Sequence, residues 1–156
     1  MKSCFFIGHR DAGEEVAALL AETIEHHISA YGVRIFYVGH YGAFDSLAAR
    51  AVIASKKRHS CIRLYMLLPY HPADRPVPVS DGFDGTYYPE GQETVPRRVA
   101  IIRANEYMVR NSDYLIAYVQ HPSAGAREIL ELALKRQQQG FIQVTNLAGW
   151  NPTVSK

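Results

Sequence analysis

"VRIFYVGHYGAFDSLAARAVIASKKR", residues 33–58, decides the fold class, because it joins a buried strand to a helix through a glycine-rich turn. Residues 33–39 form a mostly apolar run of strand length, and residues 43–58 carry apolar side chains at helical spacing. An apolar strand followed directly by a helix is typical of a parallel sheet that is covered on both faces.

The same unit recurs along the chain. Further strands are predicted at 3–8, 61–69, 113–120 and 141–147, and further helices at 11–32, 97–112 and 123–140. Asp11 is expected to cap the first helix, which Gly32 ends and which turns Leu19 toward the core. The alternation predicts an α/β fold, a three-layer Rossmann-like domain with helices on both faces. Its mainly parallel five-stranded sheet is expected in the order 3-2-1-4-5.

Length and composition fit one domain. The 156 residues are 47% hydrophobic and 21% charged, which is ordinary for a globular protein. We therefore expect a single nucleotide-binding domain over 1–156 with one long loop at 70–96. That loop is rich in proline and glycine, but its aromatic residues argue against simple disorder.

Charge and cysteine content exclude several classes. A net charge of +2 without a basic stripe argues against nucleic acid as a partner. Neither an apolar span nor a signal peptide is evident, so we expect a cytoplasmic protein. Cys4 and Cys61 each fall in a predicted buried strand, which favours small buried side chains over a disulfide. The histidines lack metal-ligand spacing, and neither a metal nor a cofactor is predicted.

Three strand-to-helix turns should meet where the strand order reverses: "GHRDAG" (8–13), "GHYGAFD" (39–45) and "QHPSAGA" (120–126). Ligands of open parallel sheets bind at that edge, and the first amides of the following helices would be unpaired donors for an anion. The candidate ligand-binding residues in these turns are Gly8, His9, Arg10, Gly39, Gly42, Asp45, Ser123, Ala124, Gly125 and Ala126. Each glycine could also serve only to tighten its turn. None of the turns matches the dinucleotide or P-loop pattern.

Charged residues near this edge have two readings each. Asp45 could accept from ribose or base hydroxyls, or cap the second helix. Glu128 could lie beside a phosphate, or be a surface acid in the first turn of its helix. On the third helix, one of the arginines, with Arg98 as candidate, should reach the crevice. Glu93 is a candidate ribose ligand or a solvated loop charge.

Four stretches in order along the chain, "FFIGHR", "FYVGHYGAFDSLA", "ETVPRRVAI..AN.YMV..SDYLIAYVQH" and "GAREILELALK", resemble a bacterial family of the SLOG superfamily, the Smf/DprA- and LOG-like Rossmannoid proteins. The resemblance implies binding of nucleotides or nucleotide-derived ligands. It also implies, by itself alone, a homodimer. Among the superfamily are the lonely-guy phosphoribohydrolases, which cut nucleoside monophosphates into base and ribose 5-phosphate.

The hydrolase motif PGGxGTxEE is kept only in outline. Gly125 matches the glycine before the threonine and Glu128 the first glutamate, but Ala126 replaces the threonine and Ile129 the second glutamate. The turn is also two residues longer. The helix arginine of the hydrolases falls on Ala104, with Arg103 one position away.

Two functions follow from the resemblance. The first is a sensor or binding module for a nucleoside phosphate or an ADP-ribose-like ligand. The alternative is an N-glycosidase, in which Glu128 stabilises a ribosyl cation and Arg103 holds the phosphate. If Arg103 points into the crevice beside Glu128, the enzyme is favoured; if it points to solvent, binding is favoured.

Overall fold

The computed structural model of the protein describes residues 1–120 and 124–149. Its centre is a parallel sheet of six strands in the order β4-β3-β2-β1-β5-β6. The strands are β1 (Lys2–Gly8), β2 (Val33–Val38), β3 (Arg63–Leu67), β4 (Gly85–Tyr87), β5 (Tyr114–Tyr118) and β6 (Gln143–Asn146). The predicted three-layer Rossmann-like class is confirmed. The five predicted strands keep the order 3-2-1-4-5, but the strand count was wrong, because β4 is added at the edge beside β3.

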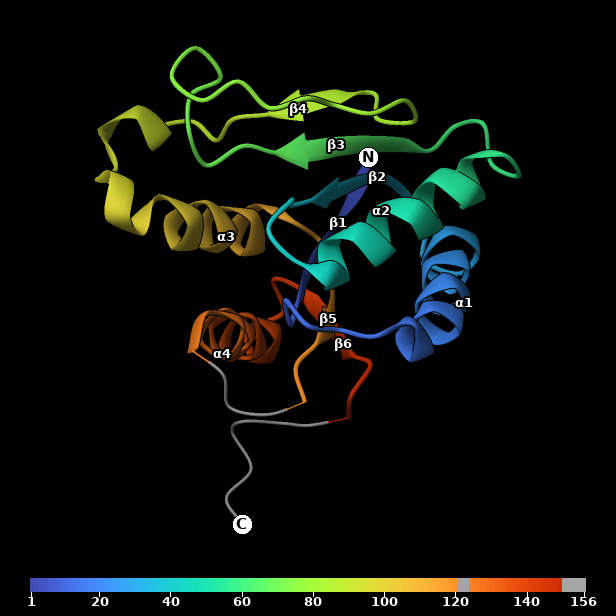
Figure 1. Ribbon diagram of the computed structural model, residues 1–156. Helices are drawn as coiled ribbons and strands as arrows, with labels where there is room; N and C mark the ends of the chain where they lie inside the picture. Colours follow the sequence, from blue (N-terminus) through green and yellow to red (C-terminus); the bar gives the residue numbers. More distant parts are fainter. Residues whose placement is uncertain (121–123, 150–156) are drawn as a thin grey trace.

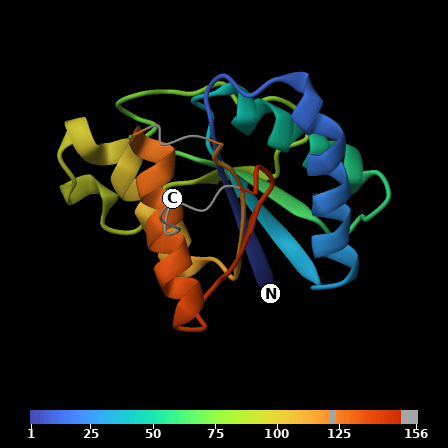
Figure 2. The ribbon, with the colours of Figure 1, turned by 90° about the horizontal axis from the view of Figure 1, so that it is seen from below.

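Two helices cover each face of this sheet (Figures 1 and 2). α1 (Ala17–Ser29) and α2 (Ala43–Lys56) lie on one face, and α3 (Ala100–Asn111) and α4 (Ala124–Gln138) on the other. Short 3-10 turns stand at η1 (Glu14–Val16), η2 (Gln92–Thr94) and η3 (Arg97–Val99). Within residues 1–120 and 124–149, none of the helices is both long and apolar enough to cross a bilayer.

The central strand β1 feeds both cores because its side chains alternate between the two faces. Phe6 packs into the cluster that α1 and α2 complete with Leu20 and Val52. Phe5 packs into the other cluster, with Met108 of α3 and Leu130 of α4. Both phenylalanines are 1% exposed, which explains why β1 reads as a continuous apolar run.

β1 pairs in parallel with β2 on one side and with β5 on the other. The predicted adjacency of residues 3–8 and 113–120 is therefore confirmed, with Cys4 opposite Tyr114 and Gly8 opposite Tyr118. The chain changes direction across the sheet between β1 and β5. This is the point where open α/β sheets bind their ligands.

The extra strand β4 is attached through Asp84, which directly precedes it. The Leu64 N–H donates to the Asp84 carboxylate at 2.8 Å, and the Asp84 N–H donates to the Leu64 carbonyl at 2.7 Å. Lys56 of α2 donates to the same carboxylate and to the Gly82 carbonyl, both at 2.6 Å. Part of the predicted loop 70–96 is thus fixed to the sheet edge.

Three local predictions were wrong. Asp11 does not cap the first helix, since the N-cap of η1 is Gly13, which makes no side-chain cap hydrogen bond. Leu19 is 46% exposed, because it lies on the solvent side of α1. Cys61 is also exposed, because β3 begins two residues later. Gly32 ends the α1 region as predicted, with a φ of 73° that favours glycine.

Candidate functional site

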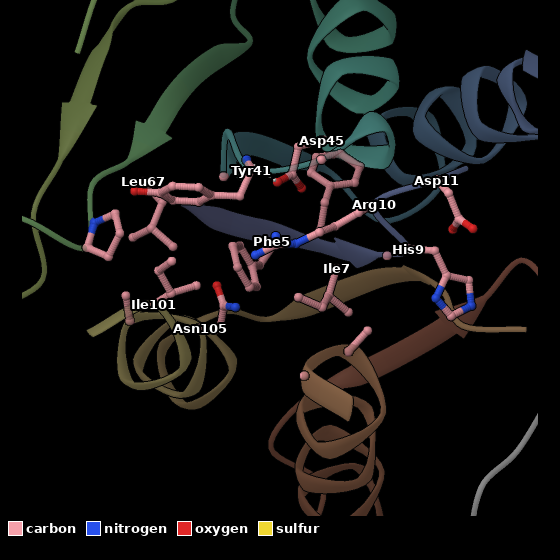
Figure 3. A pocket seen from close by; sticks show the side chains of 18 residues that line it. Phe5, Ile7, His9, Arg10, Asp11, Tyr41, Asp45, Leu67, Ile101 and Asn105 are labelled. Carbon is pink, nitrogen blue, oxygen red and sulfur yellow. Dashed lines mark hydrogen bonds between the residues drawn. The ribbon is translucent and has the colours of Figure 1, made fainter. Parts of the chain in front are cut away.

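A cavity of about 500 Å³ lies at the carboxyl ends of β1, β2 and β3, against α3 and the start of α4 (Figure 3). This volume is in the range of small-molecule sites. Apolar side chains from three elements line part of it: Phe5 and Ile7 of β1, Leu67 of β3, and Ile101 and Ala104 of α3. Polar side chains from the turns after β1 and β2 line the rest. We call this space the main cavity.

His9 connects the three turns that meet at the main cavity. It is 5% exposed, and its Nε2 accepts the N–H of Gln120 after β5 at 2.7 Å. Its carbonyl accepts the N–H of Phe44 in the first turn of α2 at 3.4 Å. His9 therefore lines the cavity as a residue engaged with the protein, and Figure 3 shows its ring at one edge of the site.

The first amides of α2 are not free for a ligand. The Ala43 N–H donates to the Arg10 carbonyl at 2.9 Å, and the next amide, that of Phe44, is taken by His9. The expectation of unpaired amides at this turn was wrong, because the turn after β1 acts as the cap of α2.

Two of the turn glycines permit this close packing. A Cβ at Gly42 would lie 2.7 Å from Cα of Arg10, and a Cβ on Gly8 would overlap the Phe44 ring. Both contacts are shorter than van der Waals packing allows. Gly8, Gly39 and Gly42 also line the main cavity. For Gly8 and Gly42, the packing of one turn on the other is reason enough for glycine.

Asp45 faces the cavity from the first turn of α2, but does not cap the helix. The N-cap is Gly42, and the Asp45 carboxylate instead accepts the N–H of Tyr41 at 3.1 Å. Its side chain is partly accessible through the cavity, although protein surrounds the carboxyl on its other sides. Burial raises the pKa of Asp45 to about 6, against the opposing effects of the Tyr41 amide and the charge of Arg10.

Three further polar side chains line the cavity without a hydrogen bond or ion pair among the described residues: the guanidinium of Arg10, the hydroxyl of Tyr41 and the amide of Asn105. Figure 3 shows Arg10 reaching into the middle of the cavity, with Asp45 and Asn105 on opposite sides. Tyr41 packs on His40, with 4.2 Å between ring centroids. Unused donors and acceptors over an apolar surface are the usual composition of a ligand site.

The start of α4 contributes Gly125 and Ala126 to the cavity lining. Gly125 has non-helical backbone angles, and a Cβ built on it meets nothing within 4 Å. Ala124 is the first residue of α4. Ser123, predicted to bind the ligand, lies outside the described residues.

Four predicted site residues lie away from the main cavity. The side chain of Arg103 is 62% exposed and lies 3.6 Å from Glu106 on the same helix. Glu128 and Arg98 are exposed and outside the lining. Glu93 lines a different, smaller cavity. The structure thus brings together the turn residues and leaves apart the two candidate catalytic residues.

Sequence reasoning missed Tyr41 and Asn105. Tyr41 stood inside the quoted turn "GHYGAFD", where only the glycines and the aspartate were weighed. Asn105 directly follows Ala104, and a polar residue next to buried positions on α3 was the available signal. Across residues 1–120 and 124–149, no group of three or more His, Cys, Asp and Glu side chains could hold a metal ion.

Comparison with known proteins gives a likeness of fold. No protein-family model matches the chain, and no curated protein does. Two solved structures of the Moco carrier protein from Chlamydomonas reinhardtii are similar, with TM-scores of 0.52 and 0.51 at 17% and 18% identity. In both, the match covers 96% of this chain and 93% of the other. The chain therefore shares a Rossmann-like α/β fold with these carrier proteins.

Proposed function

We propose that the main cavity binds a phosphate-bearing nucleotide or nucleotide-derived molecule, and that the protein is a sensor or binding module for it. The observation that carries the proposal is Arg10. Its guanidinium reaches into the cavity and has no ion pair among the described residues. A guanidinium offers a fork of donors that matches a phosphate group.

The other lining residues suit the remaining parts of such a ligand. The start of α4 at Gly125 and Ala126 favours the negative phosphate, as helix N-termini do. Tyr41 and Asn105 can hydrogen-bond a ribose or base, while Asp45 accepts from a hydroxyl. Phe5 and Leu67 offer the apolar surface that a base covers.

Two likenesses support this ligand class. The SLOG resemblance in the sequence points to nucleotides. The similar solved structures are named as carriers of Moco, which agrees with binding of a small molecule in this fold. We also propose, from the sequence, a homodimer in the cytoplasm.

The N-glycosidase is the alternative. It requires an arginine beside Glu128 in the crevice, whereas Arg103 is largely exposed beside Glu106 and Glu128 lies outside the cavity lining. Their placement supports binding over hydrolysis.

The test is a calorimetric titration of the protein with AMP, GMP, CMP, UMP and Moco, using wild type, Arg10→Gln and Arg103→Gln. At least one ligand should bind the wild type, and Arg10→Gln should weaken it by about tenfold to a hundredfold, since a charged donor is lost. Arg103→Gln is the matched control and should bind normally. Equal affinities for all three proteins would contradict the proposal.

Product analysis separates binding from hydrolysis. Monophosphate incubated with wild-type protein should stay intact, with no release of free base above that in buffer. Base release that disappears in Glu128→Gln would replace the sensor by the N-glycosidase.

A further inference from the structure

A second cavity, of about 210 Å³, lies directly beside the main one. Pro69 lines both cavities. On the other side, Ala100 lines the second cavity and the next residue, Ile101, lines the main one. The two spaces thus share a boundary made by the end of β3 and the first turn of α3.

The polar groups of the second cavity are mostly hydrogen-bond acceptors. Gln92 is 6% exposed, and its amide nitrogen already donates to the carbonyls of Pro69 at 3.1 Å and Ala100 at 2.7 Å. Its amide oxygen is left as an acceptor. The carboxylates of Asp74 and Glu93 add more acceptors, and neither forms an ion pair within residues 1–120 and 124–149.

Aromatic rings complete the second cavity and are held in place. His71 Nδ1 accepts the Ala73 N–H at 3.0 Å, and the His71 ring meets Tyr88 edge to face at 5.3 Å between centroids. Burial first, and then the charges of Glu93 and Asp74, raise the pKa of Tyr88. Both carboxylates therefore lie near the Tyr88 hydroxyl, and the cavity combines negative charge with flat ring surfaces.

A cation stands near the boundary of the two cavities. The Arg75 guanidinium lies 4.1 Å from the centroid of the Tyr70 ring, and Tyr70 lines the second cavity. Tyr41 of the main cavity is close to both, since its pKa is raised by burial and then by Tyr70, and is lowered by Arg75. Arg75 is thus placed to meet an anionic group that passes from one cavity to the other.

We propose that the second cavity takes a hydroxyl-rich sugar group that is joined through a diphosphate to the nucleoside in the main cavity. The inference rests on the proposed function. Acceptors and carboxylates suit hydroxyl donors and repel a phosphate, so the second cavity differs in chemistry from the site of Arg10. Arg97 also lines it, but the two carboxylates outnumber this single cation. The ligand is a nucleoside diphosphate sugar in class.

The test compares three ligand lengths by calorimetry: AMP, GMP and UMP; ADP, GDP and UDP; and ADP-ribose, GDP-mannose and UDP-glucose. For at least one base, the sugar conjugate should bind about tenfold more tightly than the diphosphate. The double variant Asp74→Asn, Glu93→Gln should remove this gain and leave the diphosphate affinity unchanged. Glu90→Gln, an exposed acid of the same segment outside the cavity lining, is the matched control.

The outcomes separate this inference from the proposed function. Sugar conjugates no tighter than their diphosphates would overturn the inference while Arg10-dependent nucleotide binding still stood. Tighter binding of CDP-ethanolamine than of any sugar conjugate would show that the second cavity takes an ammonium group, and would also overturn it. If no nucleotide binds and Arg10→Gln changes nothing, both proposals fail.

Discussion

The N–H of Gln120, just after β5, donates to Nε2 of His9, just after β1, at 2.7 Å. The two residues lie on either side of the point where the strand order reverses. An imidazole that serves as an acceptor here closes a gap that backbone pairing leaves open, since β1 and β5 pair only as far as Gly8 and Tyr118. The cavity wall at this point depends on a side chain rather than on the sheet.

His9→Leu should lower the free energy of unfolding by about 1–3 kcal/mol, because the buried Gln120 N–H loses its acceptor. Urea denaturation followed by circular dichroism measures the loss. His26→Leu, on the exposed side of α1, is the control and should change stability by less than about 0.5 kcal/mol. Equal losses in both variants would show that His9 has no special role.

Gly42→Ala should destabilise the fold by about 1–3 kcal/mol, because its Cβ would lie 2.7 Å from Cα of Arg10 and one turn would have to move. Thermal unfolding without ligand measures this. Gly91 is no control, since its φ of 85° strains any other residue. The better comparison is Gly125→Ala, whose Cβ meets nothing within 4 Å; a loss as large in that variant would contradict the packing argument.

Gly125→Val should abolish nucleotide binding and keep the fold. The added side chain has open space around its Cβ and would occupy the place of the phosphate at the start of α4. Titration calorimetry and circular dichroism on the same sample report the two effects. Undiminished affinity in the folded variant would exclude a phosphate from this end of the cavity.

Asp45→Asn should stabilise the unliganded protein at pH 7.5 by about 1–3 kcal/mol. The folded pKa of Asp45 is about 6, above its ordinary value of 3.8, so the folded state holds a proton that the unfolded state has released. Between these values stability falls as pH rises, and above pH 6 the full cost of the buried charge is present. The gain from the substitution should therefore vanish near pH 4. A gain equal at pH 4 and pH 7.5 would have another cause than this charge.

Asp45→Asn should also weaken binding of the ligand, by about tenfold to a hundredfold at pH 7.5, because a charged acceptor for a hydroxyl is lost. Calorimetry on wild type and variant measures this. A more stable variant with weaker binding would identify Asp45 as a residue kept for the ligand at the expense of the fold. Normal affinity would make Asp45 structural, as the acceptor of the Tyr41 amide.

The sheet order was predictable because long apolar strands alternate with amphipathic helices, and few right-handed arrangements satisfy that pattern. β4 was not. It has three residues, two of them Gly85 and Thr86, and no apolar run announces it. It forms because the Asp84 carboxylate holds Leu64 and Lys56, and a contact across 20 or more residues leaves no local signal.

The site was predictable in part for a similar reason. Strand-to-helix turns locate the cavity, so Arg10 and Asp45 could be found from the sequence. Asn105 could not, because its place depends on how α3 is rotated against the sheet. The orientation of Arg103 depends on the same rotation, and one residue along a helix turns a side chain by about 100°.

The turns after β1 and β2 are locked together by the Arg10 carbonyl, the Ala43 N–H and the absent side chain of Gly42. Insertions or deletions in one turn would break the match with the other, so evolution can lengthen neither of them separately. The segment between β3 and α3 has no such partner along most of its length. Divergence among relatives of this protein should therefore concentrate there, beside the second cavity, and change which ligands are accepted while the seam of the two turns stays constant in length.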